Sequence, residues 1–301
     1  MALDQIFTLL SVLLQSVGKV LYGTFLQGVT VPAFLLMSLA LTAGVFIIRA
    51  GWRPPVEGRR HLLIINLTTA GNFISFFFAL KYVSPAVVAS LDLGAALGAA
   101  MILARVADGA SLATTRFIAC AGIMAGCLLL SAAEIRILPS DKNPVFLMLA
   151  LFASAASGIT ATLSAREAKK LAIAKWTPSE VLAHRFYLSL AIAAVWFVMS
   201  DTDVRLPALS VVPIVVGVAA VAVLVPLLLI QIALRTCDAL TLTVCFAAQP
   251  LLSFLIALPS PAYSLDYMTL IGVTIVTAFL GLDIVSQREL VHSGAAGRRS
   301  R

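Results

Sequence analysis

Six polar side chains inside long apolar segments are the candidates for chemistry in this sequence. They are Gln15, Lys19, Tyr22, Asn72, Asp92 and Gln249. Lys19 and Asp92 are the costliest, because an ionisable side chain within a bilayer costs about 2.5–3.5 kcal/mol to insert. Gln15 lies four residues before Lys19 and Tyr22 lies three after it, so helical spacing brings these three near one face. We predict that the six residues bind a small-molecule substrate.

The two charged residues have several chemical roles open to them. Lys19 can bind a carboxylate or phosphate of a substrate, or it can neutralise a buried acid. Asp92 can bind and release a proton, hold a substrate amine, or form a permanent ion pair with Lys19. We predict Asp92 as the proton-coupling residue, and the sequence leaves open whether the two charges are ligands or a structural pair.

Other polar residues in apolar segments have simpler expected roles. Arg185 and His184 are expected near one membrane surface, extended towards water or in a simple ion pair with Glu180. Asp283 is expected at the membrane interface. Most of the small and hydroxyl residues between positions 154 and 162 are expected to allow close helix packing.

No motif in the sequence predicts a catalytic residue, a metal site or a cofactor. The four cysteines, at positions 120, 127, 237 and 245, contain no CxxC pair and have no neighbouring histidine. There is no Walker A motif, no HExxH motif and no pair of acids within one span. We therefore predict no enzymatic activity. A membrane-embedded enzyme and a non-transporting membrane scaffold are the competing hypotheses.

Composition indicates that these segments lie in a membrane. Of the 301 residues, 61% are hydrophobic and 12% are charged, whereas soluble chains average about half and about a quarter. The mean hydropathy is +1.04. The surplus apolar surface must face lipid, so membrane lipid is a predicted partner. The formal net charge is +7, but the basic residues lie in a few loops, and we predict no nucleic-acid binding.

Ten apolar runs are long enough for membrane-spanning helices, which need about 20 residues. They cover residues 6–27, 32–50, 61–80, 85–105, 114–133, 144–164, 178–200, 209–231, 238–258 and 267–286. Of the 21 Lys and Arg residues, two lie within spans, four fall in loops on one side (Lys81, Arg136, Lys142 and Arg205) and the other fifteen fall on the opposite side. The positive-inside rule then predicts a multi-pass protein of the inner or plasma membrane with both termini in the cytoplasm.

The two halves of the chain carry an internal repeat. Ala79-Leu80-Lys81 matches Ala233-Leu234-Arg235, and a span rich in small residues follows each triplet. We predict two five-helix repeats, residues 1–135 and 144–286, followed by a basic cytoplasmic tail, residues 287–301. An odd number of spans in each repeat inverts the second repeat relative to the first. The predicted fold is therefore an all-α membrane protein with ten transmembrane helices in two inverted five-helix repeats.

Three segments resemble a known family. The run FFALKYVSPAVVASL, from Phe77 to Leu91, resembles the junction between the third and fourth helices of the drug/metabolite transporter superfamily, EamA type. The segment from Ala233 to Pro250 resembles the same element in the second half. Pro178 followed seven residues later by Arg185 resembles the opening of the seventh helix. The resemblance covers nearly the whole chain and implies a ten-helix exporter of small metabolites.

We therefore expect a secondary transporter that exports an amino acid, a related compound or a drug by alternating access between its two repeats. Proton antiport through Asp92 suits these residues, and so do exchange and passive facilitation. The sequence also leaves a homodimer open.

Overall fold

The described part of the chain is built from helices. The computed structural model describes residues 3–25, 29–106, 109, 114–136, 143–199, 210–236, 245–260 and 267–299, and no β-strand occurs within them. The helices are α1 (Leu3–Phe25), α2 (Val31–Ala50), α3 (Arg59–Tyr82), α4 (Pro85–Val106), α5 (Thr114–Arg136), α6 (Pro144–Ile173), α7 (Pro178–His184), α8 (Tyr187–Met199), α9 (Val212–Ala219), the π-helix η1 (Ala220–Leu224), α10 (Val225–Thr236), α12 (Gln249–Ala257) and α13 (Tyr267–Arg299).

Nine helical stretches in the described ranges are long and apolar enough to cross a bilayer, and Cys245–Ala257 is a shorter apolar helix. These features suit a multi-pass, all-α membrane protein. The first five helices agree with the predicted spans to within three residues at each end. The predicted span 238–258 begins outside the described residues. Cys237, Lys142 and Arg205 also lie outside them.

Two helices are longer than the predicted spans. The sixth predicted span ends at residue 164, but α6 continues to Ile173 and has 30 residues. At 1.5 Å per residue α6 is about 45 Å long, against about 30 Å of hydrocarbon, so its last turns with Arg166 and Lys169 can extend beyond the apolar layer. α13 likewise continues to Arg299, through most of the predicted tail.

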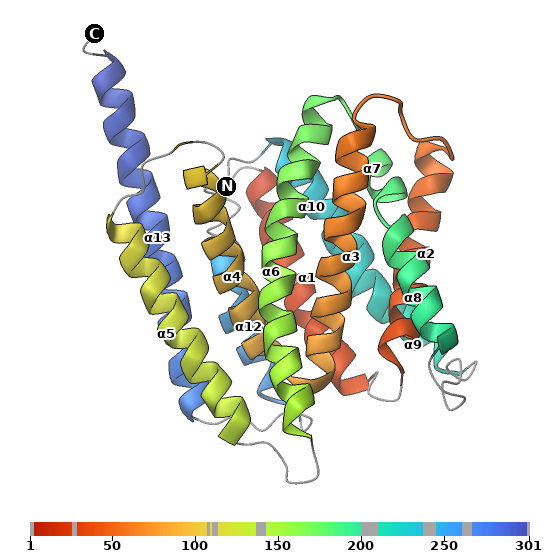
Figure 1. The fold of residues 1–301 in the computed structure, drawn as a ribbon, viewed down its shortest axis with the longest axis horizontal. Coiled ribbons are helices and arrows are strands. Elements are labelled where there is room, and N and C mark those ends of the chain that lie inside the picture. The colour runs from red at the N-terminus through yellow and green to blue at the C-terminus, as the bar shows by residue number, and fades with distance from the viewer. Residues whose placement is uncertain are drawn as a thin grey trace.

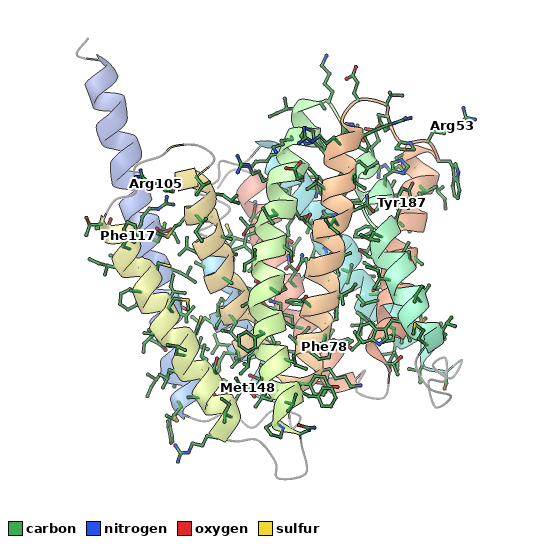
Figure 2. The ribbon with its side chains drawn as sticks, viewed as in Figure 1. Arg53, Phe78, Arg105, Phe117, Met148 and Tyr187 are labelled. Carbon is green, nitrogen blue, oxygen red and sulfur yellow. The ribbon has the colours of Figure 1, made fainter. Side chains whose placement is uncertain are left out.

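The helices form one bundle, and α1 begins at the same end of the bundle at which α13 ends (Figure 1). The main packed pairs are α3 with α6, α5 with α13, α1 with α10, and α4 with both α6 and α12. Large apolar side chains such as Phe117 and Met148 are exposed on the outside of the bundle (Figure 2). An outer surface of this kind suits contact with lipid tails.

The seventh span is broken where a side chain from α3 takes over its backbone hydrogen bonds. α7 ends at His184, and α8 begins three residues later. Asn66 Nδ2 donates to the carbonyl oxygen of His184 (2.9 Å), and Asn66 Oδ1 accepts from the amide of Leu188 (3.3 Å). The buried amide of Asn66 thus satisfies backbone groups that the break would otherwise leave unpaired.

The eighth span contains the π-helix η1, which ends two residues before Pro226. Proline has no backbone N–H and therefore cannot make the regular helical hydrogen bond at that point. π-Helical turns are frequent at functional sites. Here Ala222 of η1 and Pro226 both line the cavity described below.

Asp283 in α13, which we predicted at the membrane interface, is buried within the bundle. Its side chain is fully buried, and its Oδ1 accepts a hydrogen bond from Nε of Arg116 at 3.1 Å. The reason is tertiary: α5 packs along α13 and brings its cation to the buried carboxylate.

Candidate functional site

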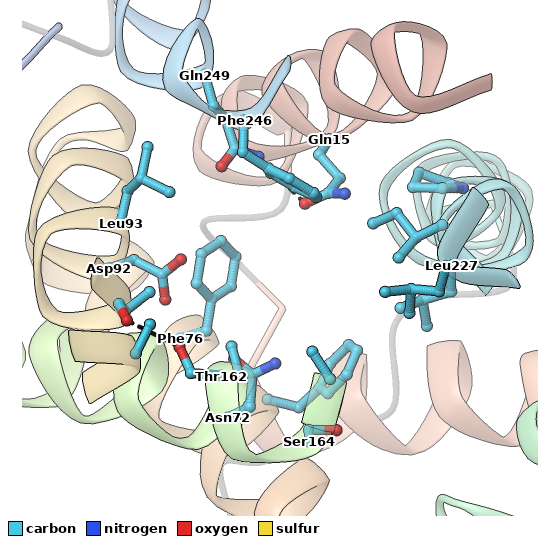
Figure 3. Close-up of a pocket in the computed structure, with 18 of the residues that line it drawn as sticks. Gln15, Asn72, Phe76, Asp92, Leu93, Thr162, Ser164, Leu227, Phe246 and Gln249 are labelled. Carbon is cyan, nitrogen blue, oxygen red and sulfur yellow. Dashed lines mark hydrogen bonds between the residues drawn. The ribbon is translucent and has the colours of Figure 1, made fainter. Parts of the chain in front are cut away.

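A cavity of about 570 Å³ lies inside the bundle, with residues of α1, α3, α4, α6, α10 and α12 in its wall. Five of the six predicted binding residues line it, namely Gln15, Lys19, Asn72, Asp92 and Gln249. Figure 3 shows labelled side chains from several helices arranged around a common open space. Small-molecule sites usually enclose about 300–1,000 Å³, so this cavity has room for a metabolite.

Tyr22 is the predicted residue that does not line the cavity. Its ring packs against Phe34, with 4.8 Å between the ring centroids, and against Phe77 at 5.2 Å. Phe34 and Phe77 are 5.0 Å apart and complete an aromatic cluster. Tyr22 therefore lies behind the wall, where it supports Phe77, which does line the cavity.

Lys19 is buried in the wall without a hydrogen-bonding partner. The residue is 4% exposed, and its Nζ makes no hydrogen bond to any described residue. The ammonium lies 4.9 Å from the centroid of the Phe76 ring, which is a cation–π distance. Gly18 lets α1 reach this position, because a Cβ there would overlap Ala222. A buried ammonium with three unused N–H donors is costly unless a ligand or water binds it.

Asp92 is held by α6. The hydroxyl of Ser157 donates a hydrogen bond to Asp92 Oδ1. The next residue is Gly158, and a Cβ there would overlap the carbonyl oxygen of Asp92, so the two backbones touch. One turn further along α4, Thr162 Oγ1 donates to the carbonyl oxygen of Ala96 at 3.1 Å. Backbone contact and a hydroxyl donor thus orient the carboxylate.

Lys19 and Asp92 line the same cavity but do not form a salt bridge. The ion pairs within the described ranges join other side chains: His61 with Glu167, Lys170 with Glu167, and Arg116 with Asp283. A permanent Lys19–Asp92 pair, which the sequence left open, is therefore not the arrangement found. The ammonium of Lys19 can therefore donate hydrogen bonds to a ligand in the cavity.

A chain of hydrogen bonds crosses a second part of the wall. Gln249 Nε2 donates to Gln15 Oε1 at 3.1 Å. Gln15 Nε2 then donates to Ser11 Oγ at 3.2 Å, and Ser11 Oγ donates to the carbonyl oxygen of Pro226 at 2.9 Å. The two predicted glutamines therefore join α1 to α10 and α12 as well as lining the cavity.

Arg185 neither extends to water nor pairs with an acid, so its prediction was wrong. It is 5% exposed and lines the cavity. Its Nε and Nη2 donate to Thr69 Oγ1 at 3.2 and 3.1 Å, and Nη2 donates to Ser164 Oγ at 2.7 Å. The break between α7 and α8 explains the placement, because it turns Arg185 towards α3 and α6.

The expected pair of Glu180 with His184 does not form a salt bridge either. Glu180 makes a capping box with Thr177 at the start of α7. His184 is fully buried, and its Nδ1 hydrogen-bonds the hydroxyl of Tyr187. Both side chains thus make hydrogen bonds within their own segment, although the buried Nε2 of His184 has no hydrogen-bonding partner among the described residues.

The two ends of the cavity differ in chemistry. Towards the end of the bundle where α4 and α6 finish, the wall includes Ala104, Arg166 and Lys169. Towards the other end the wall is made by Phe77 and Leu80, which are buried, and the aromatic cluster stands behind them. One end is therefore basic and the other apolar.

Ser157, Ser164 and Thr69 are the site residues that sequence reasoning missed. Most small and hydroxyl residues between positions 154 and 162 were expected to allow packing, which suits the close contact at Gly158. Ser157 also donates a hydrogen bond to Asp92, and Ser164, just beyond that range, accepts one from Arg185. Ser157 and Ser164 are seven residues apart, which is two helical turns and therefore one face. That spacing is the signal that could have found them.

The cavity offers little to a metal. Among the described residues no group of three His, Cys, Asp or Glu side chains could hold a metal ion. The described cavity lining contains one carboxylate, that of Asp92, and no histidine or cysteine.

No family model and no curated protein matches this chain. Nineteen chains of solved structures do match it. One of them, described only as "Crystal structure of protein", has a TM-score of 0.66 and 19% sequence identity, and the match covers 95% of this chain and 98% of that one. At this identity the likeness shows a shared fold over nearly the full length.

Proposed function

We propose that this protein is a secondary transporter of the inner or plasma membrane that exports a small metabolite by alternating access. The observation that carries the proposal is the cavity of about 570 Å³ within a bundle of apolar helices, lined by a buried lysine and an aspartate that form no salt bridge with each other. Ionisable groups within spans are expensive and mark substrate or ion pathways. Lys19 differs from the buried structural charges of Asp283 and Arg185, because no described side chain accepts a hydrogen bond from its ammonium.

The proposed architecture is ten transmembrane helices in two inverted repeats, residues 1–135 and 144–286, with Cys245–Ala257 in the ninth span. Reciprocal helix contacts support it. If α1 corresponds to α6, α3 to α10 and α4 to α12, the contact of α3 with α6 corresponds to that of α10 with α1. The contact of α4 with α6 then corresponds to that of α12 with α1. A two-fold relation between halves produces paired contacts of this kind.

We place the chain, as part of the same proposal, in the drug/metabolite transporter superfamily, EamA type. The support is the resemblance of the run from Phe77 to Leu91 and of the Pro178 to Arg185 segment to elements of that family. By the positive-inside rule both chain ends are proposed to face the cytoplasm. A reporter fused after Arg301 should then be active in its cytoplasmic form, and activity of a periplasmic reporter there would contradict this orientation.

In the proposed cycle this structure is the state that faces the cytoplasm. The basic end of the cavity lies where α4 and α6 finish, at the same end of the bundle at which α1 begins and α13 ends (Figure 1). The opposite end is closed by the aromatic cluster and by a hydrogen bond of 3.0 Å between Thr24 and Ser260. Rocking of one repeat against the other would part these contacts and expose the cavity to the other side.

Asp92 is the proposed proton carrier, because it is the only acid in the described cavity lining and Ser157 orients its carboxylate. With proton antiport, an imposed pH gradient should drive flux, and Asp92→Asn should remove that dependence. Exchange or passive facilitation would use the same cavity without the gradient.

A membrane-embedded enzyme is the competing function, and we propose that the chain is not one. An enzyme would need a nucleophile with a base, or a metal, at the cavity. The hydroxyl of Ser157 donates its hydrogen bond to Asp92, and the described cavity lining has no histidine that could act as a base to activate a serine nucleophile.

The test is export from liposomes without prior choice of substrate. Purified protein is reconstituted into liposomes loaded with a bacterial metabolite extract, and the metabolites lost from the lumen are identified by mass spectrometry. One chemical class should leave the protein-containing liposomes faster than protein-free liposomes. Equal losses from both, with folded protein in the membrane, would overturn the proposal.

A further inference from the structure

We propose that the substrate is an organic anion with an apolar body, and that Lys19 binds its acidic group. This inference rests on the proposed transport function, because it names the substrate class of the same cavity. It is argued from the charges, the free donors and the apolar surface of the wall.

The charges that line the cavity are strongly unequal. In the described lining, the cations are Lys19, Arg166, Lys169 and Arg185, and the only acid is Asp92. Glu167, the acid nearest in sequence to two of these cations, is outside this lining and is paired with His61 and Lys170. A cleft with one sign of charge and low-dielectric walls concentrates ions of the opposite sign. The cavity should therefore favour anions.

Lys19 supplies the specific contact. It is 4% exposed, lines the cavity and has no hydrogen-bonding partner among the described residues. The carboxylate of Asp92 does not fill this role, because it accepts from Ser157 and forms no salt bridge with Lys19. An acidic group of a ligand would provide the acceptor that the protein does not, through a charge-assisted hydrogen bond.

The remaining wall sets the character of the rest of the substrate. Beside Lys19 the cavity is lined by Phe76, and further along by Phe73, Leu97 and Leu227. Asn72 and Thr162 add neutral polar groups (Figure 3). An apolar body can pack on the aromatic wall while its acidic group meets the ammonium. A cation would meet the carboxylate of Asp92 but also the like charges of Lys19, Lys169 and Arg185.

The test measures the preference for anions directly and does not need the natural substrate. The four cysteines are replaced by alanine and one reporter cysteine is introduced as Ala96→Cys, a half-buried position in the cavity wall. Its modification rates are compared for two reagents of similar size, the anionic sulfonatoethyl and the cationic trimethylammonioethyl methanethiosulfonate. A potential of a few kT at this site makes the anionic reagent at least about tenfold faster, relative to a small free thiol.

Matched variants assign the preference to single charges. Lys19→Met should reduce the anionic-to-cationic rate ratio, and Asp92→Asn should increase it. Lys81→Met makes the same chemical change at an exposed position outside the cavity and should leave the ratio as it was. If Lys19→Met does not fold, which gel filtration reports, Lys19→Gln takes its place.

Two results would overturn the inference: a ratio no higher than that of the free thiol, or a ratio unchanged by removal of Lys19. Neither result depends on transport. Export of cations or neutral compounds from the liposomes, with no preference for anions, would leave the proposed function standing and remove this inference. A high ratio that depends on Lys19, without any export, would support the anion site and remove the proposed function.

Discussion

Lys19 and Arg185 are buried cations in the wall of one cavity, and neither forms a salt bridge with a described acid. Arg185 donates three hydrogen bonds, two to Thr69 and one to Ser164, and stacks near Phe186 with 5.6 Å to the ring centroid. Lys19 donates none to the described protein, and the ring of Phe76 lies 4.9 Å from its ammonium. Protein hydroxyls therefore accept hydrogen bonds from Arg185, whereas no described protein group accepts one from Lys19.

This difference separates a cation that holds helices together from a cation that is available to bind a ligand. Hydroxyls from α3 and α6 fix Arg185 at the break between α7 and α8, so its charge is part of the packing. The donors of Lys19 have no such partners, and a group left unsatisfied in a folded protein calls for a functional explanation. Four substitutions test this separation.

Lys19→Met should have the largest effect, and on flux. We expect export to fall about ten- to hundredfold, since a charge-assisted hydrogen bond is worth about 1.5–3 kcal/mol. The melting temperature should stay the same or rise, because an unsatisfied buried ammonium is costly. Flux into an external trap and thermal unfolding in detergent measure the two quantities. Lys81→Met is the control, and wild-type flux in Lys19→Met would remove the role of Lys19.

Arg185→Met should act mainly on stability. Loss of the guanidinium leaves the hydroxyls of Thr69 and Ser164 without their donor, and we expect the free energy of unfolding to fall by about 2–3 kcal/mol. Arg53→Met removes an exposed arginine between α2 and α3 and should change the free energy of unfolding by less than about 0.5 kcal/mol. Denaturation of both variants by tryptophan fluorescence gives the comparison. If Arg185→Met is as stable as the wild type, the two cations do not differ as argued.

Ser157→Ala should have an intermediate effect, because it removes the donor that orients Asp92. We expect flux to fall about tenfold, the equivalent of one charge-assisted hydrogen bond. Ser154→Ala is the matched control on the same helix face, since its hydroxyl donates only to the carbonyl oxygen of Ala150 within α6. Initial rates of export under one pH gradient measure both. Equal rates for the two variants would show that Ser157 does not position Asp92.

Glu167→Gln should have the smallest effect, and on stability. It extends the comparison to cations that form a salt bridge with an acid. Glu167 pairs with His61 and Lys170 at 2.6 Å each, but side chains of both partners are about one-third exposed or more. Such pairs contribute about 0.2–1 kcal/mol and are weakened by salt. The stability difference from the wild type should therefore be small and should shrink in 1 M NaCl. A large loss that salt does not reduce would contradict this ranking.

Much of the fold could be predicted from the sequence, because the bilayer acts on each segment separately. A run of about 20 apolar residues must be helical to satisfy its own backbone, wherever its neighbours are. The first five helices therefore agree with the predicted spans, and Pro85 and Pro144 begin helices as proline can. The cost of burying charge is equally local, and it identified Lys19 and Asp92, both of which line the cavity.

Partners were decided only by the tertiary structure, since a hydrogen bond or an ion pair depends on which helices touch. Asp283 accepts a hydrogen bond from Arg116 because α5 packs against α13. Arg185 donates to Thr69 and Ser164 because the seventh span breaks beside it. Tyr22 shares a helix with Lys19 but points into an aromatic cluster instead of the cavity. Local spacing determined which polar residues lie within apolar segments, and helix packing decided which donors were left without a partner.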